Sequence, residues 1–178
     1  MNNIVREKLS EGINFTYIPQ DKFKTTLISF SMITPLSKED APKNAVLSGL
    51  LAHSCKQFPR LSDLSIKLEE LYGASIHPSN SRLGESQVIT ITAKGLNSKF
   101  AYENSNNILE LANLICEMIF NPDLNGEMFK NENVNQEKRE LIESINSEMN
   151  DKKLYAKKRC IEIMCENEKF GIDPQGSI

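Results

Sequence analysis

The sequence lacks several residue types and motifs that mark common classes of protein. It contains no tryptophan, two histidines and four cysteines in 178 residues. The cysteines are scattered through expected helices and form no C-x-x-C pair, which argues against a disulfide framework or a zinc knuckle. We therefore expect all four to be reduced thiols that pack as small hydrophobic residues. They are Cys55, Cys116, Cys160 and Cys165.

Charge and hydropathy exclude further classes. The net charge is −3 and the signs are interleaved, so no basic surface for nucleic acid is expected. No apolar run approaches the roughly 20 residues of a membrane-spanning helix. Near the N-terminus, charged residues stand where a signal peptide would have its apolar core. We expect a soluble, cytoplasmic protein without a nucleic-acid or membrane partner. The sequence also contains no G-x-S-x-G elbow and no glycine-rich phosphate loop.

The hydrophobic pattern predicts an α+β domain with the element order ββ-αα-ββ-αα. Alternating residues predict strands, and apolar residues at helical spacing predict helices. We expect strands at 13–20, 25–34, 74–83 and 86–95, and helices at 42–56, 62–72, 108–119 and 127–166. The first two strands are expected to pair through the turn "PQDK", the next two to join at Gly84, and Ser62 to cap the second helix. The helices should pack on one side of an antiparallel sheet.

With 39% hydrophobic residues, the chain can bury one sizeable core, so residues 1–178 are expected to form a single domain. The closing run "EKFGIDPQGSI" stops where a further helix or strand would be expected. We therefore expect this domain to be a piece of a longer chain, with two or four domains in all.

Two segments resemble a known family. "LSDLSIKLEELYGASI" and "LICEMIFNPDLNGEMFKNENVNQEKRELIESI" are similar to the insulinase, pitrilysin and mitochondrial processing peptidase family. The run "INSEMNDKKLYAKKRC" is closest to its non-catalytic bacterial subunits of the YfmF/YmfF type. The resemblance extends from Ile13 onward and implies a LuxS/MPP-like metallohydrolase fold, in which the present chain would be the N-terminal peptidase domain.

Active members of this family are zinc peptidases with an inverted H-x-x-E-H motif. Two histidines four residues apart share one Zn²⁺ on a helix face, and the glutamate between them activates the bound water. Aligning "SCKQFP" with the family's Gly-Thr loop places these three positions on Ala45, Ser48 and Gly49. Alanine and glycine have no ligand atoms, and serine is not a useful general base at neutral pH. The resemblance therefore implies that the catalytic zinc site is lost.

The later helix carries the corresponding acidic positions. The distal zinc-binding carboxylate falls on Ser144, which adjoins Glu143, and Glu137 matches a supporting acidic position. The two histidines, His53 and His77, could in principle make a site with Glu137 or Glu143, but nothing in the sequence brings them together. We expect His53 to be a partly exposed residue at a helix end and His77 to be a surface residue.

The resemblance implies a catalytically inactive homologue with no metal and no cofactor of its own. Such a chain would be a substrate-binding or chamber-completing subunit, in a heterodimer with an active zinc-bearing paralogue that acts on a peptide or protein substrate. Two alternatives remain open at this point. One is an active zinc-dependent metallopeptidase with a non-standard site, and the other is an α+β scaffold unrelated to peptidases.

Overall fold

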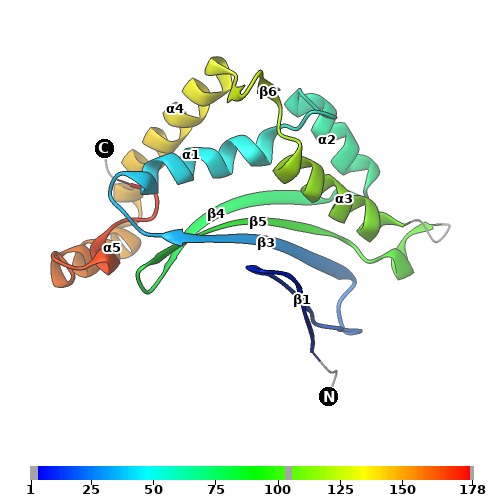
Figure 1. The fold of residues 1–178 in the computed structure, drawn as a ribbon, viewed down its shortest axis with the longest axis horizontal. Helices are drawn as coiled ribbons and strands as arrows, with labels where there is room; N and C mark the ends of the chain where they lie inside the picture. The colour runs from blue at the N-terminus through cyan, green and yellow to red at the C-terminus, as the bar shows by residue number, and fades with distance from the viewer. Residues whose placement is uncertain (1–3, 103–105, 177–178) are drawn as a thin grey trace.

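The computed structural model describes residues 4–102 and 106–176. Three strands form the main sheet, and helices lie above one of its faces (Figure 1). The strands are β1 (Val5–Ser10), β2 (Ile13–Tyr17), β3 (Thr25–Pro35), β4 (Ser75–Leu83), β5 (Ser86–Leu96), β6 (Leu124–Asn125) and β7 (Met128–Phe129). The α-helices are α1 (Asp40–His53), α2 (Leu61–Glu70), α3 (Asn107–Phe120), α4 (Asn131–Ser147) and α5 (Lys152–Met164). The α+β class predicted from the sequence is confirmed.

The main sheet is antiparallel and has the order β3-β5-β4. Strand β5 lies in the centre, and its alternation buries Ile89, Ile91 and Ala93 on the face that the helices cover. The turn between β4 and β5 contains Gly84 with a φ of +58°, a conformation that favours glycine. This hairpin was predicted from the sequence and is confirmed.

The core lies between this sheet and the helices. Helix α1 contacts β4 and β5, while α3 contacts β5 and β3. The buried cluster draws mainly on α3, with Leu64 from α2 and Leu71 just after it, and its α3 members are Leu111, Leu114, Ile115 and Met118. Phe30 on β3 meets Phe120 at the end of α3 edge-to-face, with 6.0 Å between the ring centroids. Within the described residues, no helix is long and apolar enough to cross a membrane.

The expected pairing of the first two strands is wrong. Strand β2 pairs with β1, with Val5 opposite Tyr17, and β3 pairs with β5 instead. The connection between β1 and β2 is two residues long and ends in Gly12 with a φ of +77°. Two-residue turns of this kind are the favoured hairpin connections, whereas residues 18–24 make a longer link that includes Pro19. The short turn therefore decides the pairing.

The single helix expected over 127–166 is also wrong. Residues 124–129 form the small β6–β7 hairpin around Gly126, and the helical stretch is divided into α4 and α5. Asp151 caps α5, because its Oδ1 accepts hydrogen bonds from the backbone N–H groups of Lys153 and Leu154 at 3.2 and 3.0 Å. Helix α2 begins at Leu61 after Arg60, so Ser62 is not its N-cap.

The four cysteines are free thiols, as expected, but they are not all packed inside. Cys55 is fully buried in the core, whereas Cys116 and Cys160 are exposed. The expectation that the thiols pack as small hydrophobic residues therefore fails for these two. Both cysteines lie on the solvent-facing side of their helices. The spacing of apolar residues alone does not distinguish that side from the buried one.

Candidate functional site

Helix α1 turns the three motif positions toward the interior. Ala45 and Ser48 are 7% and 2% exposed, and Gly49 is also buried. Residues three and four apart share one face of a helix, so the three positions lie together on the face where H-x-x-E-H would stand. The helix thus keeps the shape that a zinc site would require.

Glu137 of α4 occupies the space in front of Gly49. A Cβ built on Gly49 would lie 2.9 Å from the carboxyl carbon of Glu137, and closer still to its Oε2. Real Cβ atoms do not approach other atoms this closely, so a larger residue at position 49 would have to displace the carboxylate. A histidine ligand therefore does not fit at this position while Glu137 keeps its place.

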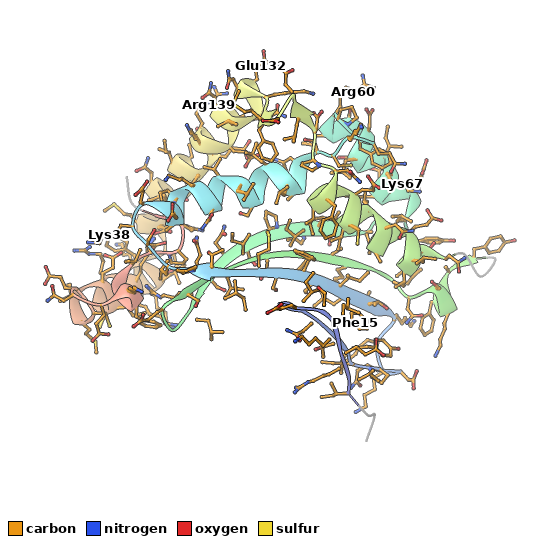
Figure 2. All side chains as sticks on the ribbon, viewed as in Figure 1. Phe15, Lys38, Arg60, Lys67, Glu132 and Arg139 are labelled. Carbon is orange, nitrogen blue, oxygen red and sulfur yellow. The ribbon has the colours of Figure 1, made fainter. Side chains whose placement is uncertain are left out.

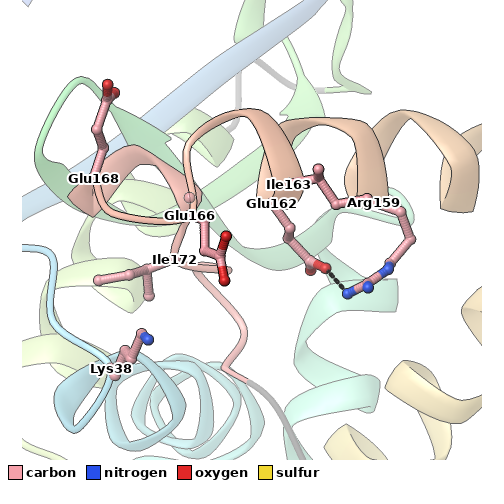
Figure 3. A pocket seen from close by; sticks show the side chains of 8 residues that line it. Lys38, Arg159, Glu162, Ile163, Glu166, Glu168 and Ile172 are labelled. Atoms are coloured by element: carbon pink, nitrogen blue, oxygen red, sulfur yellow. Dashed lines mark hydrogen bonds and ion pairs between the residues drawn. The ribbon is translucent and has the colours of Figure 1, made fainter.

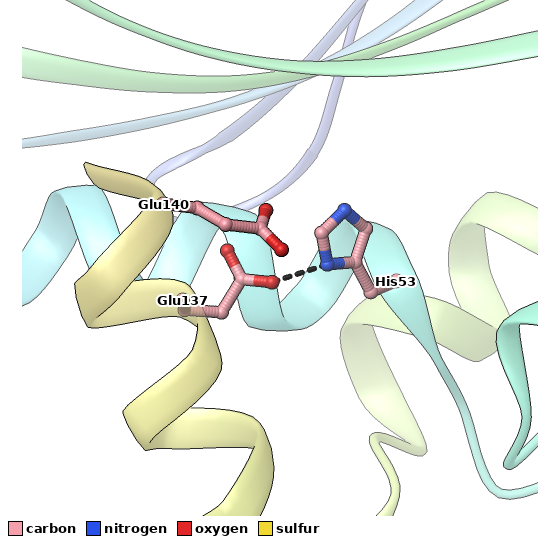
Figure 4. Close-up of side chains that lie close together, drawn as sticks. All are labelled: His53, Glu137 and Glu140. Atoms are coloured by element: carbon pink, nitrogen blue, oxygen red, sulfur yellow. Dashed lines mark ion pairs between the residues drawn. The ribbon is translucent and has the colours of Figure 1, made fainter. Parts of the chain in front are cut away.

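The same carboxylate forms an ion pair with His53, one helical turn beyond Gly49 (Figure 4). Glu137 is 8% exposed, and its Oε1 meets the Nδ1 of His53. The hydrogen bond to Glu137 raises the pKa of His53, burial opposes that rise, and the negative charges of Glu137 and Glu140 add to it. This ion pair links the end of α1 to the middle of α4.

Ser48 takes part in a different hydrogen-bond chain. Its hydroxyl donates to the backbone carbonyl of Ala45 at 2.8 Å and accepts from the Nδ2 of Asn80 at 2.8 Å. Asn80 lies on β4, and its Oδ1 is buried without a hydrogen-bond partner among the described residues. The position of the family's general base therefore holds a serine whose hydroxyl joins α1 to the sheet.

The remaining predicted positions lie outside this cluster. Ser144 and Glu143 are both exposed on α4, beyond Glu137 along the helix. His77 is exposed on β4, and its side chain points to the face of the sheet opposite Asn80, because an offset of three positions along a strand puts side chains on opposite faces. The structure therefore brings His53 to Glu137 and leaves His77 apart. Glu140 and Asn80 were not identified from the sequence, which has no local pattern that pairs them with α1.

Two of the cavities lined by the described residues border α1 or α5. One, of about 230 Å³, borders the ion pair and is lined by His53 and Glu137 together with Leu50, Arg60 and Gln136. The other, of about 310 Å³, lies between α5 and the residues after it (Figure 3). Its lining mixes Lys38 and Arg159 with Glu162 and Glu166, and Arg159 forms an ion pair with Glu162. Because opposite charges are mixed there, this second cavity shows no preference for a ligand of one sign.

The family's zinc ion does not fit the residues present. Ala45 and Gly49 offer no donor atom, and the Glu137 carboxylate fills the space beside Gly49. Fold and site together define the class: an α+β domain that resembles a zinc peptidase domain but lacks metal ligands at Ala45 and Gly49.

Comparisons with known proteins agree with this class. The chain is 32% identical over 167 residues to a probable inactive metalloprotease, YmfF, of Bacillus subtilis (strain 168), covering 94% of this chain and 39% of that protein. A conserved protein from Enterococcus faecalis V583 matches with a TM-score of 0.87 and 28% identity, over 98% of this chain and 41% of that one. No family model matches the sequence.

A third comparison extends the likeness in fold. A peptidase M16 inactive domain from Pseudomonas fluorescens matches with a TM-score of 0.64 and 14% identity, over 98% of this chain and 39% of that one. The chain thus spans about two fifths of the length of these relatives. It is similar to a probable inactive metalloprotease over 94% of its own length and shares the fold of a peptidase M16 inactive domain.

Proposed function

We propose that this chain acts as a non-catalytic subunit beside an active zinc peptidase of the same family. The observation that carries the proposal is the packed α1–α4 pair, in which Ala45 and Gly49 offer no metal ligand and the Glu137 carboxylate occupies the space beside Gly49. Folding depends on the buried apolar residues and not on metal ligands, so such a domain keeps its architecture after catalysis is lost. We propose that the zinc for hydrolysis belongs to the partner and that this chain needs no cofactor for its role.

Exposed apolar side chains support a role in association. The β1–β2 hairpin is exposed along its whole length, and Ile13, Phe15 and Tyr17 are each about half exposed (Figure 2). On the uncovered face of the main sheet, Leu27 and Ile33 are each 65% exposed. Apolar surface of this kind typically marks contacts with other polypeptide. It suits a subunit that completes a chamber or holds an extended substrate.

The same proposal covers the type of fold and the part of the longer relatives to which this chain corresponds. We propose a LuxS/MPP-like metallohydrolase fold, with the 178 residues corresponding to one N-terminal peptidase domain of the longer relatives. The chain covers 39–41% of those proteins, a share that suits one part of a longer chain. We also propose that the complex works in the cytoplasm on a peptide or protein substrate.

Affinity capture tests the partnership. The tagged protein is expressed in its native host, and co-purifying proteins are identified by mass spectrometry against an unrelated protein with the same tag. The proposal predicts enrichment of an insulinase-like protein with an intact H-x-x-E-H motif. Repeated capture without such a protein would contradict the partnership. Zinc-dependent cleavage by the chain alone would instead favour the alternative of an active metallopeptidase.

A further inference from the structure

Three possible metal-ligating side chains converge where the end of α1 meets α4. His53 lies in the last turn of α1, and Glu137 and Glu140 are three residues apart on α4, so they share a face of that helix. One donor atom from each of the three lies within 4.8 Å of the other two. Figure 4 shows both carboxylates close to the imidazole ring. None of the three stands at an H-x-x-E-H position.

The charges in this cluster do not balance. Two carboxylates face one imidazole, so the group stays negative even when His53 is protonated. The hydrogen bond to Glu140 comes from the neutral amide of Gln136, at 2.9 Å. Glu137 is buried, and a buried carboxylate depends strongly on a nearby positive charge. A divalent cation would neutralise both carboxylates at once.

We propose that this chain binds one divalent transition-metal ion of the zinc class through His53, Glu137 and Glu140. An imidazole nitrogen with carboxylate oxygens is a typical zinc ligand set, whereas calcium and magnesium prefer oxygen ligands alone. The cavity of about 230 Å³ beside His53 and Glu137 is large enough for the water that would complete the coordination. Binding replaces the direct ion pair with two bonds to the metal and releases the imidazole proton to solvent.

This ion would hold the two helices together and would not cleave peptides. Ser48 stands at the position of the family's general base, and its hydroxyl is engaged with Ala45 and Asn80. The metal site goes beyond the proposed function and is independent of it: either one can fail without the other.

Calorimetric titration of zinc chloride into the chelator-treated, reduced protein tests the site. Cys116, Cys160 and Cys165 are first changed to serine, because thiolates that reach solvent would compete for zinc. We expect one equivalent of zinc per chain. Glu140→Gln keeps the shape of an exposed side chain but removes its charge, and should weaken binding at least tenfold. Glu143→Gln, a matched exposed change on the same helix, should leave the affinity unchanged.

His53→Gln should abolish saturable binding, and circular dichroism shows whether the variant is folded. If it is not, the comparison of Glu140→Gln with Glu143→Gln decides the question alone. The absence of saturable zinc binding, or equal affinities in the Glu140→Gln and unmodified proteins, would overturn the proposal. Cobalt(II) provides a second readout, since a thiolate charge-transfer band would place the metal on Cys55 and would also overturn it.

Discussion

Replacing Gly49 by alanine should destabilise the protein, although glycine-to-alanine changes inside helices normally stabilise. The added methyl would lie 2.9 Å from the carboxyl carbon of Glu137, which is buried and cannot swing freely into solvent. Forcing an extra carbon into a packed site costs about 1–3 kcal/mol. Moving the carboxylate also weakens its ion pair with His53. The higher helix propensity of alanine offsets about 1 kcal/mol of this loss in stability.

We therefore expect a net loss of about 1–2 kcal/mol in the free energy of unfolding, once the helix propensity is subtracted from the packing cost and a weakened ion pair of up to about 1 kcal/mol is added. Urea denaturation followed by circular dichroism, in chelator, measures this difference. Ser144→Ala, an exposed change on α4, is a control for routine substitution in a helix and should change stability by less than about 0.5 kcal/mol.

A double variant isolates the cause. In a Glu137→Ala background the obstructing carboxylate is gone, so Gly49→Ala should become neutral or stabilising by up to about 1 kcal/mol. A Gly49→Ala protein that is more stable than the unmodified chain would refute the steric reasoning. So would an equal effect of Gly49→Ala in both backgrounds.

Further predictions concern other contacts of the site and fold. The pKa of His53, followed by NMR in chelator, should lie above its ordinary 6.5 and fall in Glu137→Gln. Because the folded pKa is raised, this ion pair should stabilise fully below pH 6.5, and its contribution should fade as pH rises through the folded value. Ser48→Ala should cost about 1 kcal/mol in urea denaturation, since the partly buried amide of Asn80 loses its acceptor; an unchanged midpoint would contradict that role. Asp151→Ala should lose about 1 kcal/mol and show reduced helicity by circular dichroism, whereas unchanged helicity would argue against the cap.

Local sequence signals were sufficient for part of the fold. The alternation on β5 and the tight turn at Gly84 act between neighbouring residues, so the β4–β5 hairpin could be predicted. The pairing of β2 does not follow from alternation alone, because the two-residue turn at Gly12 and the run "PQDK" are both turn signals and only the first closes a hairpin with β2. The break between α4 and α5 depends on the Asp151 side chain, which a pattern of apolar residues does not register.

The candidate site, too, could be predicted from the sequence only in part. The absence of ligand atoms at Ala45 and Gly49 follows from residue type alone once the helix is aligned with the family. The meeting of His53 with Glu137 does not, because 84 positions of chain separate them and their contact depends on how α4 crosses α1. Ser144 aligned with the distal ligand, yet the residue that α4 presents to Gly49 is Glu137.

The central claim is that this chain lacks a catalytic zinc site, and a cleavage assay tests it most directly. The purified protein is incubated with a mixed peptide library and saturating zinc, with and without 1,10-phenanthroline, and products are read by mass spectrometry. We predict no cleavage that the chelator suppresses. Chelator-sensitive cleavage that co-purifies with the folded chain through successive columns would contradict the account.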